Sequence, residues 1–287
     1  MYNVIILPSH TVKGMSNSSS KITGRSLIRA GWSTLSDDRE LLALPLLGGV
    51  ISIFVVIPFG GIYFLIPDEA GLLQWVPIIA GMLLYNLIIV FFAVALAAGA
   101  VERMNGGDPT VSSSMRVAWS RRSGIFQWSL LTTAFGLLLR IIEQRLPTAG
   151  KFISALGGLT WAIASYFVIP VIAVENVSGF DALRSSARVI KERWGKVLRF
   201  NLRILIYQFI ILVPTIVLVI NGVLISQRDN NPLAVLLIVV ALLFLFSTSF
   251  LLSAVVAIAR VALYRYAVGM PVPGFDSSVL ERAVKSA

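Results

Sequence analysis

The chain has no cysteine and only one histidine, His10, among its 287 residues. Without cysteine it forms no disulfide and offers no thiolate to a metal or a redox centre. A single histidine provides no pair of imidazole ligands, and since we expect residues 1–22 to be a disordered tail, His10 is not expected to serve in a Ser–His–Asp triad. The sequence therefore predicts no cofactor, no metal site and no enzyme activity.

Charge is also scarce. Charged residues make up 13% of the chain, against roughly 25% in an ordinary soluble domain. Hydrophobic residues make up 57%, and the mean hydropathy is +0.85. No carboxylate lies in the middle of a long apolar run, so we do not expect an ion-coupled carrier, in which such a group is usual. The composition predicts that lipid is the main solvent of the protein.

Six apolar runs are long enough to cross a bilayer, which takes about 20 residues as a helix. They are Leu41–Ile66, Leu72–Val101, Gly124–Arg140, Phe152–Val174, Leu202–Leu224 and Leu233–Ile258. We therefore predict an all-α, polytopic membrane protein with six transmembrane helices. Residues 23–268 are expected to form the transmembrane domain, and residues 269–287 a cytoplasmic tail with a short helix.

Lysine and arginine residues collect in alternate gaps between these runs. Of the 24, 20 lie before the first run, between the second and third, between the fourth and fifth, or after the sixth. Because such residues are retained on the cytoplasmic side, the pattern predicts a multi-pass protein of the cell membrane with both termini in the cytoplasm. Attraction to anionic lipid accounts for the net charge of +10, so no nucleic-acid partner is expected.

A basic amphipathic segment precedes each odd-numbered run. The clearest one places Leu183, Ala187, Ile190, Trp194 and Val197 at helical spacing beside Arg184, Arg188, Lys191 and Arg199. Ser178 and Asp181 fit a capping box at its start. The other two contain Ile28, Trp32 and Leu35, and Val111, Met115 and Trp119. We expect three cytoplasmic interfacial amphipathic helices, although a basic linker helix packed under the bundle would carry the same pattern.

Two sets of residues are candidates for function. The candidates for binding a lipid phosphate are Arg184, Arg188, Lys191, Arg203, Arg260 and Arg265. The candidates for lining a polar cavity are Asn86, Gln208, Ser247, Thr248 and Ser249, although such side chains usually form hydrogen bonds between helices. Pro170 and Pro214 mark the places where a broken helix would line a cavity, or where a kink is satisfied by its neighbours.

Three stretches carry a resemblance to known proteins: Gly24–Leu47, Ala173–Leu198 and Pro273–Val284. They resemble an uncharacterised family of prokaryotic six-span membrane proteins, classed as a domain of unknown function, from about Lys21 to the end of the chain. The stretch from Glu175 to Leu198 is also loosely similar to the membrane domain associated with glycerophosphoryl diester phosphodiesterases. The resemblance implies a membrane module and brings no active site with it.

Two hypotheses for the function follow. The leading one is a non-enzymatic membrane module that engages anionic lipid or a membrane partner protein through its basic interfacial helices. The rival is a permease or channel for a small solute. It is suggested by the predicted threefold repeat of interface helix, span, short turn and returning span, by the prolines and by the buried amides. A cavity in the middle of the membrane, lined by the uncharged polar candidates, would favour the rival.

Overall fold

The computed structural model describes residues 31–32, 40–67, 71, 73, 75–146, 149–193, 213–225, 232–273 and 275, and apart from short turns these residues are helical. The long helices are α2 (Glu40–Leu65), α3 (Trp75–Met104), α5 (Arg122–Arg145), α6 (Ala149–Ala164) and α10 (Pro232–Ala267). The shorter ones are α4 (Val111–Ser120), α7 (Val168–Glu175), α8 (Gly179–Arg193) and the apolar helix Val213–Ile225. The predicted all-α class is confirmed for these residues.

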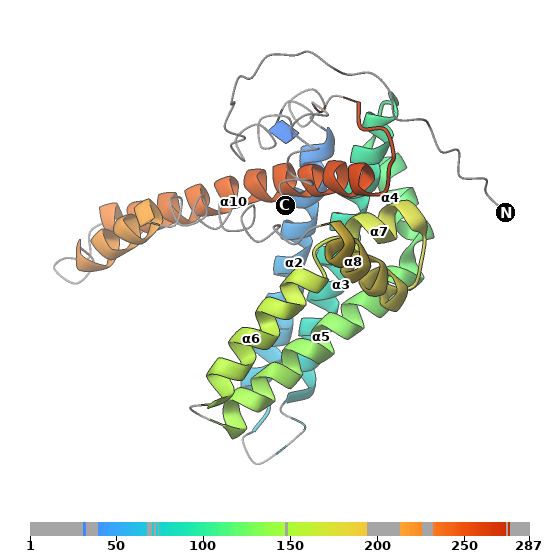
Figure 1. The fold of residues 1–287 in the computed structure, drawn as a ribbon. Coiled ribbons are helices and arrows are strands. Elements are labelled where there is room, and N and C mark those ends of the chain that lie inside the picture. Colours follow the sequence, from blue (N-terminus) through green and yellow to red (C-terminus); the bar gives the residue numbers. More distant parts are fainter. Residues whose placement is uncertain are drawn as a thin grey trace, which may run out of the picture.

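Two antiparallel helix pairs form the body of the protein. Helix α2 packs along α3, α5 packs along α6, and α3 also contacts α5 (Figure 1). The end of α2, the start of α3, the end of α5 and the start of α6 lie at one end of this bundle, whereas α4, α7, α8 and the C-terminal part of α10 gather at the other end. This arrangement is the one expected if successive loops lie on opposite sides of a membrane, as the sequence predicts. Its assignment to the two sides of a membrane rests on the distribution of charge and stays a prediction.

Small residues allow α3 to pack closely against its neighbours. A Cβ atom on Gly99 would lie 2.5 Å from Cδ2 of Leu41, and one on Gly81 would lie 2.8 Å from Cβ of Phe59. Ala95, four residues before Gly99, is completely buried. This spacing of small residues is typical of helices that approach each other in lipid, and it sets the separation of α2 and α3.

Apolar side chains also cover the outside of the bundle. Helices α2 and α5 each bury only 22% of their most apolar window, and Phe54, Phe64 and Leu65 are 73%, 84% and 83% exposed. A soluble monomer rarely exposes a contiguous apolar patch larger than roughly 300–600 Å². An apolar surface of this kind suits the hydrocarbon of a bilayer and suggests a membrane protein.

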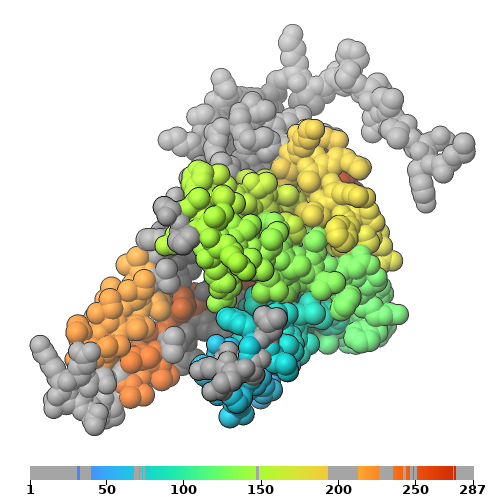
Figure 2. Space-filling view, turned by 90° about the horizontal axis from the view of Figure 1, so that it is seen from below, coloured from blue at the N-terminus to red at the C-terminus, as the bar shows by residue number. Residues whose placement is uncertain are grey.

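Four segments of the described chain are long and apolar enough to cross a membrane: α2, α3, α5 and Ala149–Glu175, which contains α6 and α7. They correspond to the first four predicted spans. The fifth predicted span, Leu202–Leu224, is described only from residue 213 onward. The sixth corresponds to α10, which runs across the direction of the other long helices in Figure 1 and projects to one side of them in Figure 2. A count of six crossings stays a prediction.

Side-chain caps fix the two helices at the end of the bundle that carries α4 and α8. A capping box closes the start of α4, and Oε2 of Glu40 accepts the Val111 N–H at 2.9 Å. At the start of α8, Oγ of Ser178 accepts the Asp181 N–H at 3.1 Å and donates to the Asp181 carboxylate at 2.6 Å. Of the predicted capping box, the bond from the Asp181 N–H to Ser178 is confirmed, and the Asp181 carboxylate accepts from the Ser178 hydroxyl. A carboxylate at each helix start also complements the positive end of the helix dipole.

Several predicted features fall outside the described residues. They are the tail of residues 1–22, all but Gly31 and Trp32 of the first interfacial helix, and the short C-terminal helix. The part of the C-terminal tail that the structure does describe packs back onto the bundle, since Val272 contacts the core and Phe275 is only 8% exposed.

Candidate functional site

Helix α8 carries three of the cations predicted to bind lipid phosphate. Arg184, Arg188 and Lys191 are exposed, and their spacing of four and three residues places them on one face. Nη1 of Arg184 lies 3.7 Å from Oδ1 of Asp181, in an ion pair whose side chains are 78% and 58% exposed. Such a surface pair contributes little to stability. Within the described part of the chain Arg188 and Lys191 form no ion pair, so this face is open to an anion.

The opposite face of α8 packs under the bundle. Ala182 and Ser186 are completely buried, and Leu183, Val189 and Ile190 pack against the core. The centre of the buried face is therefore shifted by one residue from the predicted stripe, which began at Leu183. Helix α8 combines two properties that the sequence left as alternatives, because it is packed on the protein along one side and presents cations along the other. Its position in the membrane interface stays a prediction.

Ser186 holds a break between α6 and α7. Its Oγ accepts the backbone N–H of Phe167 at 3.0 Å and donates to the carbonyl of Ala164 at 2.6 Å. Residues 165–167 form a turn rather than a helix, and backbone groups at such a break need partners when the surrounding segment is apolar. One hydroxyl group serves here as both a donor and an acceptor.

Pro170 accounts for the position of this break. Proline has no N–H, and its ring clashes with the carbonyl four residues back along a helix, which here is that of Tyr166. A cavity of about 240 Å³ lies beside the break, between α3, α7 and α10, and Pro170 is part of its wall. The prediction of a broken helix that lines a cavity is confirmed at Pro170. Pro214 is the second described residue of the helix Val213–Ile225, and the residues before it, where a break would fall, lie outside the described part of the chain.

Arg260 is the charged residue that lines this cavity. It is partly buried, and its Cζ lies 4.7 Å from the centroid of the Tyr166 ring, so its guanidinium stacks on a residue of the break. Stacking of arginine on an aromatic ring is favourable by about 0.5–2 kcal/mol. Arg260 and the three cations of α8 are therefore connected through one structural element, because Ser186 of α8 and Arg260 of α10 both contact the turn between α6 and α7.

Arg265, the next cation of α10, has a different environment. It is 4% exposed and donates to the Val101 carbonyl at 3.3 Å and to Oδ1 of Asn105 at 2.7 Å. Burial lowers the pKa of its guanidinium. Its donors connect the end of α10 to the end of α3, and the structure does not bring it together with the cations of α8. Arg203, the remaining phosphate candidate, lies outside the described residues.

Tyr264 forms a second link between α10 and the bundle. Its side chain is completely buried, and its hydroxyl donates to the carboxylate of Glu175 at the end of α7. Burial, and then the neighbouring Glu175, raise the pKa of Tyr264. Tyr264 lies beyond the predicted span Leu233–Ile258, at the end of the bundle where α7 and α8 also lie.

The uncharged polar candidates are used between and within helices where the structure describes them. Nδ2 of Asn86 donates to Oγ1 of Thr133 at 3.2 Å, which joins α3 to α5. Oγ1 of Thr248 donates to the Phe244 carbonyl at 2.6 Å, within its own helix. Neither Asn86 nor Thr248 lines the cavities beside α10. The remaining candidates, Gln208 and the side chains of Ser247 and Ser249, lie outside the described part of the chain.

Two residues of this region were not among the predicted candidates. Tyr166 had one indirect signal, its position four residues before Pro170. Ser186 had none, because a serine on the small-residue side of an amphipathic helix does not reveal which backbone groups it will meet. Within the described residues, no group of three His, Cys, Asp or Glu side chains is placed to hold a metal ion.

The sequence profile of one protein family matches residues 74–273, more than half of the chain, and its description is Family of unknown function (DUF6159). The chain belongs to this family. The DUF6159 match runs from the start of α3 to just beyond α10, so the break, Ser186 and Arg260 all lie inside it. Of the stretches that carried the resemblance, Ala173–Leu198 lies wholly within the match, and Gly24–Leu47 lies outside it.

No curated protein and no solved structure matches the chain. The looser similarity to the membrane domain associated with glycerophosphoryl diester phosphodiesterases therefore stays a prediction.

Proposed function

We propose that the protein is a non-enzymatic integral membrane protein whose helix α8 engages anionic phospholipid headgroups at the cytoplasmic face of the membrane. The division of α8 into two faces supports this proposal. Ala182 and Ser186 are completely buried against the bundle, while Arg184, Arg188 and Lys191 are exposed. Because the helix is already fixed to the spans, its cations need little further ordering when they meet a headgroup, which lowers the cost of binding.

The charges on α8 set the expected strength of this interaction. Each lysine or arginine near an anionic leaflet contributes about 1 kcal/mol. The ion pair with Asp181 reduces the contribution of Arg184 to the free energy of binding to anionic lipid. The three cations then contribute about 2–3 kcal/mol, equivalent to roughly 30- to 150-fold in a binding constant. The Debye length falls from about 8 Å at about 0.15 M salt to about 3 Å at about 1 M, so high salt should abolish the interaction.

The absence of enzyme activity is part of the proposal. One histidine and no cysteine leave few groups for nucleophilic or metal-assisted chemistry. The cations of α8 are exposed rather than gathered around a cleft, which suits a headgroup layer better than a single reacting substrate.

The test compares two variants that each lose three exposed cations. The first is Arg184→Gln/Arg188→Gln/Lys191→Gln on α8. The control is Arg140→Gln/Arg145→Gln/Lys151→Gln, at the opposite end of the bundle. The full chain is purified from mixed phosphatidylglycerol and phosphatidylcholine micelles, and the lipid that it retains is quantified by mass spectrometry.

We expect the wild type to be enriched in phosphatidylglycerol at about 0.15 M salt, where surface charges still act over about 8 Å. The α8 variant should lose at least about tenfold of this enrichment, and the control should keep it. Equal losses in both variants would show a general effect of net charge and would count against the proposal. No enrichment in the wild type would point to a partner protein as the occupant of this face.

The rival function, a permease or channel for a small solute, is favoured by the broken helix at Pro170 and the cavity beside it. The bond between Asn86 and Thr133 argues against it, because this amide is used in packing rather than in a solute path. Proteoliposomes that pass an anion, a cation or a small metabolite would support the rival. Tight proteoliposomes would leave it without support.

A further inference from the structure

Arg260 is a partly buried cation without a carboxylate partner among the described residues. Within the described part of the chain its Nε is buried without a hydrogen-bond partner, as is the Nε of Arg265. The two residues differ at their other nitrogens, because Arg265, five residues further along the same helix, uses its Nη groups on Val101 and Asn105. A cation in apolar surroundings is costly unless a counter-charge and hydrogen-bond acceptors accompany it. Arg260 therefore lacks the anion that its position requires.

The contact with Tyr166 brings no negative charge to Arg260. Cζ of Arg260 lies over the Tyr166 ring, 4.7 Å from its centroid, and the planar set of N–H donors of a guanidinium matches the oxygens of a phosphate. Tyr166 itself is 5% exposed, and its hydroxyl has no hydrogen-bond partner among the residues that the structure describes. The Nε atom of Arg260 and the hydroxyl of Tyr166 are thus both buried without such a partner, which is uncommon in a folded protein.

The cavity beside Arg260 is apolar along the rest of its length. It has a volume of about 240 Å³, and its other polar side chain is that of Ser253, seven residues or about 10 Å back along α10. The wall also includes Ala93 and Ala97 of α3 and Pro170 of α7. One end of the cavity is therefore cationic, and the remainder suits hydrocarbon.

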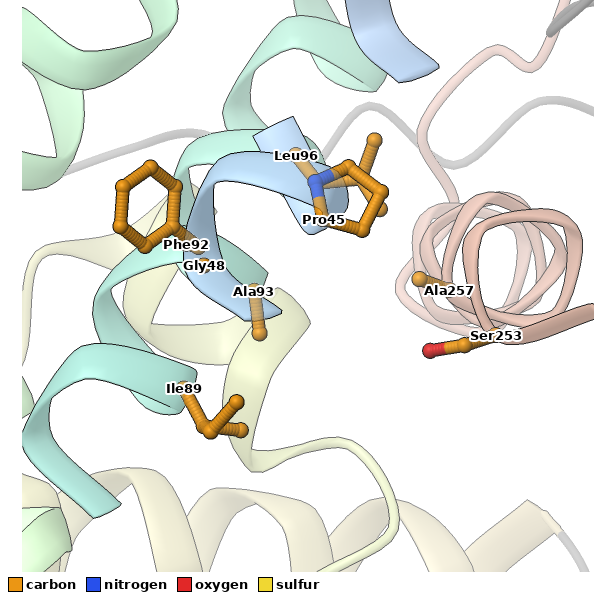
Figure 3. A pocket seen from close by; sticks show the side chains of 8 residues that line it. All are labelled: Pro45, Gly48, Ile89, Phe92, Ala93, Leu96, Ser253 and Ala257. Atoms are coloured by element: carbon orange, nitrogen blue, oxygen red, sulfur yellow. The ribbon is translucent and has the colours of Figure 1, made fainter. Parts of the chain in front are cut away.

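A second cavity of about 210 Å³ extends this apolar space. It shares Ala93, Ser253 and Ala257 with the first cavity and continues between α10 and the pair of α2 and α3, beside Pro45 and Phe92. Figure 3 shows Ser253 and Ala257 of α10 facing α2 and α3 across this space. A ligand that fits both cavities has an anionic group at one end and a hydrocarbon chain at the other, which is the chemistry of an anionic phospholipid.

We propose that Arg260, together with Tyr166, binds the phosphate of one anionic phospholipid, and that an acyl chain of this lipid occupies the two cavities along α10. The inference deepens the proposed function, since it concerns the same class of ligand, but the site is separate from the exposed face of α8. The headgroup lies beside the α6–α7 break that Ser186 holds from its other side. Lipid at this site would fix α10 against α3 and α7.

The experiment measures the phosphatidylglycerol that the full chain retains after a wash at about 1 M salt, where the Debye length of about 3 Å removes lipid held only by surface charge. The wild type should retain a salt-resistant lipid. Arg260→Gln should reduce this retention by about tenfold or more, the effect of losing hydrogen bonds to a charged group. Arg260→Lys, which keeps the charge without the planar donor edge, should fall between the two.

A second variant tests the acyl-chain part of the site and does not touch Arg260. Ala257→Leu adds bulk to a wall that both cavities share, so it should also reduce the salt-resistant retention while circular dichroism shows an unchanged helix content. If Arg260→Gln fails to fold, Ala257→Leu carries the test alone. Wild-type retention in a folded Arg260→Gln or Ala257→Leu protein would overturn the inference.

Competing lipids identify the ligand. Phosphatidylcholine should compete poorly, because its headgroup has no net negative charge. Oleate should also compete poorly, because a carboxylate without the glycerophosphate places a smaller anion at Arg260. Equal competition by either lipid would overturn the assignment to an anionic phospholipid.

The two proposals fail in different ways. The α8 triple variant should lose the salt-sensitive lipid and keep the salt-resistant one, and Arg260→Gln should do the reverse. If the α8 variant alone behaves as expected, the site at Arg260 is wrong. If Arg260→Gln alone behaves as expected, the proposed role of α8 is wrong.

Discussion

Replacing Ser186 with alanine should open the junction of α6 and α7 and leave the rest of the bundle in place. The substitution removes the hydroxyl that accepts the Phe167 N–H and donates to the Ala164 carbonyl. Ser186 is completely buried, so water does not readily replace it. A lost buried partner costs about 1–3 kcal/mol. Because both bonds end in the same hydroxyl they are not additive, and we expect a total of about 2–3 kcal/mol, or roughly 30- to 150-fold in a local opening equilibrium.

Hydrogen exchange measured by mass spectrometry is the assay. Peptides that cover residues 161–170 should exchange faster in Ser186→Ala by that factor, while peptides from the middle of α5 should not change. Thr160→Ala is the matched control on α6, since Oγ1 of Thr160 donates to the Leu156 carbonyl of its own helix. Unchanged exchange around Phe167 would refute the role given to Ser186. Equally faster exchange along the whole chain would refute the prediction that only the junction of α6 and α7 opens.

Three further predictions concern packing, pH and topology. Gly124→Ala should destabilise the protein by about 1–3 kcal/mol, because the added Cβ would lie 2.5 Å from a backbone oxygen of the segment before α8. Gly136→Ala on the same helix is the control, since its Cβ meets nothing within 4 Å, and it should be neutral or stabilising. Thermal unfolding of the two variants in detergent measures the difference. The raised pKa of Tyr264 means that its protonated hydroxyl contributes to stability in full below pH 10.0, the unfolded value, and progressively less as the pH rises from there towards the folded value. Unfolding midpoints of the wild type and Tyr264→Phe should therefore converge at alkaline pH, and a constant difference would contradict this. Single cysteines replacing the exposed Arg188 and Arg145 should react with an impermeant reagent from opposite sides of sealed vesicles, and labelling from one side only would contradict the predicted topology.

Hydropathy was enough to predict the helical class and the positions of the first four long apolar helical segments, because both depend on summed properties of about 20 neighbouring residues. The cations of α8 were also predictable, since a spacing of four and three residues places Arg184, Arg188 and Lys191 on one helix face whatever the helix packs against. Pro170 indicated the break in the fourth span because its effect is local and steric.

The parts of the site that depend on distant partners were not predictable. Arg260 and Arg265 look alike in the sequence, since both are cations at the end of one apolar run. Five residues of helix separate their directions by about 140° around the axis, so one meets Tyr166 and the other meets Asn105. The sequence does not state which face of α10 meets which helix. For the same reason it could not reveal that Ser186 would meet the break.

The bond pattern of Ser186 has a consequence for the order in which the protein is built. Ala164 and Phe167 leave the ribosome before Ser186, which follows them by 22 and 19 positions. The segment Ala149–Glu175 therefore emerges from the ribosome before its hydroxyl partner does. In a nascent chain that ends before α8, we expect the turn between α6 and α7 to lack its two hydrogen bonds to Ser186, however apolar the segment is. The turn reaches its final conformation only when α8 packs against it.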